Sequence, residues 1–238
     1  MPTVPAASTA PAPLPASLLL LADSRLPTGA HVHSGGLEPA AAAGRVRTVA
    51  ALAEFLRGRL ATAGLVAAAF AAAAAAECAR PEPRWAAFDA ELDARTPSPA
   101  QREASRAQGR ALLRTAHTVW PAPALAALAA ASPGGAHHPL ALGAAAHAAA
   151  PEHAPAHAAL LAASAAVTGP ASAAVRLLAL DPLAVHGVLA ELAPSVDAVA
   201  AEARAVPDSP AELPAVSAPA LDVHAELHRG QRLRLFES

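Results

Sequence analysis

One short stretch of the sequence differs sharply from its surroundings: Leu26-Pro27-Thr28-Gly29-Ala30-His31-Val32-His33-Ser34-Gly35-Gly36-Leu37-Glu38. It holds three glycines and two histidines in a chain otherwise dominated by alanine, leucine and proline. Glycine adopts left-handed backbone conformations at little cost, so such a cluster indicates a place where the chain leaves the helix. We predict a shaped loop here. Ser34 is a candidate N-cap, and Glu38 lies in the first turn of the next helix, where a carboxylate suits the helix dipole.

On both sides of this loop the composition favours helix. The 238-residue chain is 54% hydrophobic but only 3% aromatic, and β-branched residues are sparse, so strand propensity is low. Alanine supplies much of the apolar content, and the core must therefore come from closely approaching helices. Ser105 and Gly109 form a small pair that would permit such an approach. We predict an all-α, single-domain bundle of about eight to ten helices over 17–238, with a disordered Pro/Ala-rich extension over 1–16 and a flexible tail over 229–238.

Prolines and glycines divide this bundle into segments. Thr48 is expected to cap a long helix, which Gly64 would break or kink. Two later helices are expected to be interrupted, one near 168–170 and the other near Pro194. Four prolines within 206–219 indicate a flexible linker before the last helix.

Composition also excludes several function classes. A net charge of −2 and a pI near 6.6 argue against nucleic-acid binding, which needs a basic face. A single cysteine, Cys78, excludes a disulfide or a thiolate metal cluster within one chain. The uncharged segment between Arg59 and Glu77 is mostly alanine, so we interpret it as a buried helix and not a membrane span. The N-terminus lacks the basic start of a secretory signal. We expect a cytoplasmic protein without nucleic-acid or membrane partners.

No catalytic constellation is evident. The sequence contains no P-loop, no HExxH, no serine elbow and no Rossmann fingerprint, so we do not expect an enzyme. Histidine is the one candidate metal ligand in quantity, with eleven copies. His31 and His33 are weak candidates because alternate side chains share one side of an extended loop. The pairs His137–His138 and His224/His228 are further candidates, but the sequence predicts no closed metal site.

The C-terminal tail carries large apolar groups at an end of the chain that is usually frayed. Leu233, Leu235 and Phe236 alternate with Arg232 and Arg234. Exposing these groups without a partner is unfavourable. We therefore predict that the tail docks on another protein, with arginines pairing to carboxylates at the rim.

At this point the residues resemble a known family. The stretch 21–38 is similar to the N-terminal signature of the urease accessory protein UreF family. Four further matches follow in order: Arg102-Glu103-Ala104-Ser105 with Gly109 and Leu112-Leu113; His138-Pro139-Leu140-Ala141-Leu142-Gly143; Ala174-Val175-Arg176-Leu177-Leu178-Ala179-Leu180; and His228 with Arg234-Leu235-Phe236-Glu237-Ser238. The tail departs from the family pattern at Gln231-Arg232 and at Glu237. The resemblance covers residues 17–238.

The resemblance implies an all-helical homodimer that is not itself an enzyme. Such a protein binds UreD (also called UreH) and recruits the GTPase UreG, and it acts as scaffold and regulator while the complex inserts nickel into apo-urease. No resident cofactor is expected beyond a nickel ion in transit. The alternative is a histidine-based nickel carrier that binds the ion directly. The residues expected to bind partners are Gly29, His33, Ser34, Gly35, Gly36, Glu38, Arg102, Glu103, Ser105, His228, Arg234, Leu235, Phe236 and Ser238.

Overall fold

The computed structural model describes residues 14–29, 33–230 and 236. Across this part of the chain, 73% is helical, there are no strands, and ten helices are present when α3, a π turn and α4 are counted as one. The all-α prediction and the predicted helix count are confirmed. The elements in order are α1 (Ala16–Ala22), α2 (Leu37–Ala42), α3 (Val49–Arg59), a π turn (Leu60–Gly64), α4 (Leu65–Glu77), α5 (Trp85–Arg95), α6 (Pro99–Val119), α7 (Pro123–Ala131), α8 (His138–Ala149), α9 (Ala154–Leu178), α10 (Pro182–Ala203), a 3-10 turn (Pro210–Glu212) and α11 (Pro219–Arg229).

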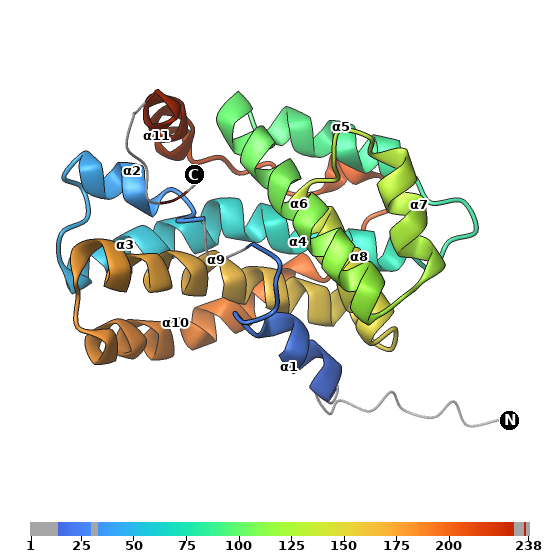
Figure 1. The fold of residues 1–238 in the computed structure, drawn as a ribbon, viewed down its shortest axis with the longest axis horizontal. Helices are drawn as coiled ribbons and strands as arrows, with labels where there is room; N and C mark the ends of the chain where they lie inside the picture. The colour runs from blue at the N-terminus through green and yellow to red at the C-terminus, as the bar shows by residue number, and fades with distance from the viewer. Residues whose placement is uncertain (1–13, 30–32, 231–235, 237–238) are drawn as a thin grey trace, which may run out of the picture.

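Two long helices form the middle of the bundle. The continuous α3–α4 helix and α9 run side by side, and α10 packs along both of them (Figure 1). Helices α5 to α8 gather at one end, where α8 packs on α4 and α6. At the other end α2 lies beside α11. The predicted extension falls mostly outside the described residues, except that α1 already begins at Ala16.

The core is built from small side chains that let backbones approach closely. Alanines 71–75 of α4 are at most 1% exposed. Gly143 of α8 faces them, and a Cβ on it would lie 2.2 Å from the carbonyl oxygen of Ala71. A Cβ on Gly109 of α6 would lie only 1.9 Å from the carbonyl oxygen of Ala136. The predicted close approach at Gly109 is confirmed, and even one methyl group would displace the neighbouring backbone.

The predicted helix interruptions at 168–170 and Pro194 are wrong, because α9 and α10 pass through both prolines. Proline lacks an N–H and frees the carbonyl four residues earlier. For Pro170 that carbonyl belongs to Ala166, and Arg59 Nε–H donates to it at 3.1 Å. Pro194 lies on the exposed side of α10, where water can serve the freed carbonyl.

The expected disturbance at Gly64 is local. Residues 60–64 form a π turn, and the helix continues into α4. The predicted cap at its start is confirmed, since Thr48 Oγ1 accepts from the N–H of Ala51 at 3.2 Å. A single bulged turn therefore lets one helix span from Val49 to Glu77.

Residues 206–219, interpreted from their prolines as a linker, lie against α5. Arg95 Nε–H donates to the carbonyl of Pro214 at 2.9 Å, and its terminal nitrogen donates to the carbonyls of Ala211 and Leu213. Leu213 itself is only 3% exposed. One arginine thus holds three carbonyls of a segment that has almost no helix of its own.

Three helical stretches are long and apolar enough to cross a membrane by length and composition alone: 49–77, 154–178 and 182–203. In the fold, 72% of the most apolar 18-residue segment of stretch 49–77 is buried inside the protein. The corresponding values are 56% for stretch 154–178 and 28% for stretch 182–203. The first value confirms the prediction of a buried helix before Glu77. Helix α10 is the outer member, and it keeps Leu183 82% exposed.

Candidate functional site

The glycine-rich loop adopts the backbone that its sequence predicts. Gly29, Gly35 and Gly36 have φ angles of +74°, +59° and +88°, in the left-handed region that favours glycine. The predicted N-cap is displaced: Gly36, not Ser34, directly precedes α2. The Ser34 hydroxyl, fully buried, still accepts from the N–H of Glu38 at 3.2 Å. The loop therefore needs glycine for its path and serine for its closure.

The same loop fits between distant helices. A Cβ on Gly35 would lie 3.0 Å from Pro170 Cγ and 3.1 Å from the guanidinium carbon of Arg59. A Cβ on Gly36 would lie 2.9 Å from a methyl group of Leu221. Because these two positions have no side chain, residues of α3, α9 and α11 can all pack directly against the loop.

Glu38 joins the opening loop to the end of the chain. Its Oε2 accepts from the N–H of Phe236 at 2.8 Å and lies 3.2 Å from Nε2 of His228. Phe236 is only 7% exposed, and the guanidinium carbon of Arg176 lies 4.5 Å from the centre of its ring. Two motifs that the sequence places almost 200 residues apart (198 between Glu38 and Phe236) therefore form one joint. We call the contacts among Glu38, Arg176, His228 and Phe236 the tail joint.

A second polar group ties α5, α6 and α8 together. His137 is 1% exposed; its Nε2 lies 2.9 Å from Asp93 Oδ1 and its Nδ1 lies 3.0 Å from Ser105 Oγ. Because a carboxylate can only accept, we assign the ring hydrogen to Nε2, and the Ser105 hydroxyl then donates to Nδ1. Burial lowers the pKa of His137 more than Asp93 raises it, so the ring is neutral near pH 7.

The partners of this group indicate a structural role. Ser105 Oγ also accepts from the N–H of His138 at 3.1 Å, which closes the start of α8 onto α6. Asp93 is shared with Arg106, whose Nη2 lies 2.9 Å from Asp93 and 2.8 Å from Asp89. The serine oxygen and the carboxylate are thus both engaged in holding helices together.

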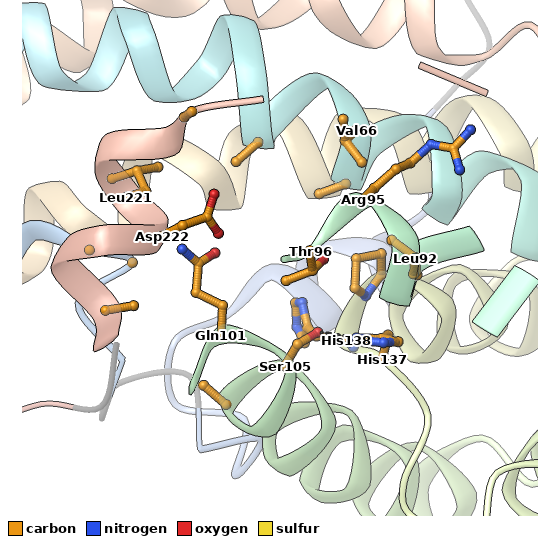
Figure 2. A pocket seen from close by; sticks show the side chains of 18 of the residues that line it. Val66, Leu92, Arg95, Thr96, Gln101, Ser105, His137, His138, Leu221 and Asp222 are labelled. Atoms are coloured by element: carbon orange, nitrogen blue, oxygen red, sulfur yellow. Dashed lines mark hydrogen bonds between the residues drawn. The ribbon is translucent and has the colours of Figure 1, made fainter. Parts of the chain in front are cut away.

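Between these two groups lies a cavity of about 210 Å³. It is bordered by the opening loop, α3, α4, α6, the end of α5, the start of α8 and the start of α11. Figure 2 shows Asp222 of α11 and Gln101 of α6 facing one another on one side, with Ser105, His137 and His138 on another. Burial, with a smaller effect of the His33 charge, lowers the pKa of His138 to about 4.

The residues predicted to bind partners fall into three groups. The loop holds Gly29, His33, Ser34, Gly35, Gly36 and Glu38, and His228 and Phe236 meet Glu38 at the tail joint. The mid-chain motif is divided: Glu103 is exposed, Arg102 Nη1–H donates to the carbonyl of Thr96 at 2.6 Å, and Ser105 faces inward. Arg234, Leu235 and Ser238 lie outside the described residues, as does His31, which was predicted only as a weak metal candidate.

The histidine pairs do not combine into a metal cluster in the part of the chain that the structure describes, which holds no group of three or more His, Cys, Asp or Glu side chains suited to a metal ion. His137 and His228 are occupied with carboxylates, and His224 Nδ1 lies 3.4 Å from the carbonyl oxygen of Pro39. His33 lines the cavity, whereas His31 falls in the undescribed part of the loop.

Sequence reasoning gave no role to Arg59 or Asp93, and it named Arg176 only as part of a family motif. Each is one charged residue on a helix, and its role appears only where a second helix brings a partner to it. Asp93 and Arg106 carried a weak signal as opposite charges on adjacent amphipathic helices. Arg59 carried none, because its position depends on a proline more than one hundred residues away in α9.

Comparison with known proteins shows the family of this chain. Residues 46–193 match the family model described as UreF. A urease accessory protein UreF of Mycolicibacterium vanbaalenii is 47% identical over 223 residues, which cover 94% of this chain and 98% of that protein. A UreF of Mycobacterium tuberculosis is 45% identical over 223 residues, with the same coverage of 94% and 98%. The chain therefore belongs to the UreF family of urease accessory proteins.

Proposed function

We propose that this protein is a scaffold and regulator of nickel insertion into urease. In this role it works as a cytoplasmic homodimer, binds UreD (UreH) and recruits the GTPase UreG, and the assembly delivers nickel to apo-urease. It performs no chemistry itself, and neither nucleic acid nor a membrane takes part. The single observation that carries the proposal is the tail joint, where the two motifs most typical of the family meet at Glu38.

The surface beside the tail joint supports a protein partner. Val223 and Leu227 of α11 are 57% and 67% exposed, and their i, i+4 spacing places them on one side of the helix. Large exposed apolar side chains next to a docked chain end are typical of protein interfaces. We assign this side of α11, together with the tail, to UreD.

The regulatory part of the proposal rests on shared residues. The opening loop, which we assign to UreG, contains Glu38, and the same carboxylate holds Phe236 of the tail. A partner that takes hold of the tail changes the contacts of Glu38 and His228, and so changes the loop. Binding at either surface is then coupled to binding at the other, and linkage requires the coupling to act in both directions.

Tail removal tests the assignment to UreD. Deleting residues 232–238 should abolish co-purification with UreD, while circular dichroism should show an unchanged helical content. Val223→Ser with Leu227→Ser should weaken the same complex, because each replaces an apolar contact. Leu183→Ser is the matched control, since it removes an even more exposed leucine that lies on α10 and not on α11. Full UreD binding by the tail deletion would refute the assignment.

The loop is tested separately. Glu38→Ala or Gly35→Ala should reduce recovery of the UreD–UreF–UreG complex and urease activation, and unchanged activation would contradict the assignment to UreG.

Calorimetry with nickel on the isolated protein separates the scaffold from a nickel carrier. One-to-one binding in the micromolar range that disappears in His31→Ala/His33→Ala would instead support the carrier.

A further inference from the structure

Arg59, the last residue of α3, places its guanidinium at the border of the cavity. Part of this arrangement is explained by packing. Pro170 frees the carbonyl of Ala166, and Arg59 Nε–H donates to that oxygen at 3.1 Å. The guanidinium also lies directly against Gly35, where a Cβ would be 3.1 Å from its terminal nitrogen. One of its five N–H groups is thereby used.

Among the described residues, no protein acceptor bonds to the four remaining N–H groups. Within residues 14–29, 33–230 and 236, no carboxylate forms an ion pair with Arg59, and no acceptor other than the Ala166 carbonyl bonds to it. Burial lowers its pKa to about 10, and no carboxylate opposes that effect. Two other arginines show the opposite shift: Glu77 raises the pKa of Arg84, and Asp89 raises the pKa of Arg106. Arg59 is only half-buried, yet a cation that is partly withdrawn from water is still stabilised by an anion within hydrogen-bonding reach.

The cavity beside Arg59 offers donors and little negative charge. His33, Gln101, Gln108 and His138 border it, and all four can donate a hydrogen bond. Asp222 is the one acidic residue among the described lining, and burial raises the pKa of its carboxyl. Figure 2 shows this aspartate on the α11 side, facing Gln101. The second cation at the border, Arg95, is already paired with Glu91.

The size of the cavity suits a small ion. Its volume is about 210 Å³. On the order of seven water molecules occupy that volume in the liquid. Phosphate or a short carboxylate fits such a space with water to spare. A guanidinium presents two parallel N–H groups to either, which is the bidentate geometry that arginine offers to planar and tetrahedral oxyanions.

We propose that this cavity is a binding site for a small free oxyanion, of phosphate or carboxylate type, which pairs with the terminal nitrogens of Arg59. The ion would supply the negative charge that the fold leaves out at this point. Because Arg59 also contacts the opening loop at Gly35 and supports α9 at Ala166, occupancy stiffens the loop against α3 and α9. The site is distinct from the tail joint, and its existence does not depend on the proposed function.

The experiment uses the full chain and two probes, inorganic phosphate and acetate, at an ionic strength held constant with sodium chloride. Thermal unfolding and phosphorus NMR line widths are followed for the wild type, Arg59→Gln and Arg57→Gln. Arg57 is the matched control, because it lies two residues away on the same helix and is exposed with a partner in Glu54. Ligands that bind only the native state raise its melting temperature.

We expect one or both probes to raise the melting temperature of the wild type and of Arg57→Gln, and to broaden the phosphate signal in the case of phosphate. Binding by Arg59→Gln should be weaker by about tenfold or more. Equal responses of all three proteins would show a general salt effect and overturn the proposal. No response of the wild type to either probe would overturn it as well.

A folding defect in Arg59→Gln is separable from a binding defect. Pro170→Ala restores the N–H that the Ala166 carbonyl lacks, so Arg59→Gln in that background loses the cation while the helix keeps its bond. Pro170→Ala alone should bind the anion like the wild type, and the double variant should not. Retained binding in the double variant would count against the site.

Discussion

The middle of the bundle and the α2–α11 end are held together by different forces. In the middle, α4, α8 and α9 pack through alanines and glycines that are almost fully buried, and backbones approach each other directly. At the α2–α11 end, single polar contacts connect segments far apart in the chain: Glu38 to Phe236, and Ser98 to Glu226. The stability of the middle therefore depends on side-chain volume, and that of the α2–α11 end depends on individual hydrogen bonds.

This difference has a functional consequence. A close-packed interior changes cooperatively and resists small adjustments. A joint made of a few polar contacts can open locally at modest cost, and segments that rearrange on binding come from this less stable part of a fold. The residues that we propose to face partners are concentrated in the second region, and in this proposal the middle acts as a rigid support.

The largest effect is expected where one methyl group is added between helices whose backbones approach closely. Gly109→Ala and Gly143→Ala should each lower the free energy of unfolding by about 3 kcal/mol, because the new Cβ meets backbone that cannot move aside. Urea unfolding followed by circular dichroism measures this. Gly58→Ala on α3, where a Cβ meets nothing within 4 Å, should instead raise stability by up to about 1 kcal/mol. Equal effects at all three glycines would remove the contrast.

The next effect concerns the contact between α3 and α9. Arg59→Gln should destabilise the wild type by about 1.5 kcal/mol, since it leaves the Ala166 carbonyl without its donor. The same substitution should cost clearly less in a Pro170→Ala background, where the helix supplies its own N–H. A double-mutant cycle from urea unfolding curves measures the coupling. Additive effects would show that Arg59 does not compensate for the proline.

A smaller global effect and a larger local one are expected at the tail joint. Glu38→Ala should lower the free energy of unfolding by about 1 kcal/mol, because Phe236 and His228 lose their carboxylate. The tail should at the same time become a faster substrate for carboxypeptidase, as its end is released. Glu103→Ala, at an exposed carboxylate on α6, serves as control. Unchanged digestion would mean that Glu38 does not retain the tail.

The effect that is smallest near neutral pH, and that grows only as the pH falls, is a change in pH dependence. Burial holds the pKa of His138 at about 4 in the folded protein, against 6.5 for an ordinary histidine. The unfolded chain therefore binds a proton first, and stability falls as the pH decreases from 6.5 towards 4. His138→Gln should flatten this slope in urea titrations at several pH values. His186→Gln on the exposed side of α10 should leave it unchanged.

Much of the fold was predictable because it rests on local patterns. Low strand propensity, the cap at Thr48 and the small pair at Ser105 and Gly109 all led to features that the structure contains. The loop glycines were recognised for the same reason, since positive φ angles are a property of single residues. The interruptions at Pro170 and Pro194 were wrong, because a proline in a helix is tolerated wherever something else serves the freed carbonyl.

The site was predictable only in its parts. Glu38, His228 and Phe236 were each recognised as functional, but as separate docking residues, and nothing local in the sequence signals that they contact one another. The inward position of Ser105 was equally hidden. Its partners, Asp93 and His137, come from two other segments of the chain.

By itself the sequence determined the helical class, the loop conformation and the family, because these depend on composition, on single-residue backbone preferences and on short motifs. The tertiary structure decided which residues share a surface and which charges are paired. Those outcomes require segments up to 198 residues apart to pack together, and their energies depend on burial and on the partner that packing provides. Arg59 is the clearest case: its residue type gave no signal, and its place between a proline, a glycine loop and a cavity gives it a role.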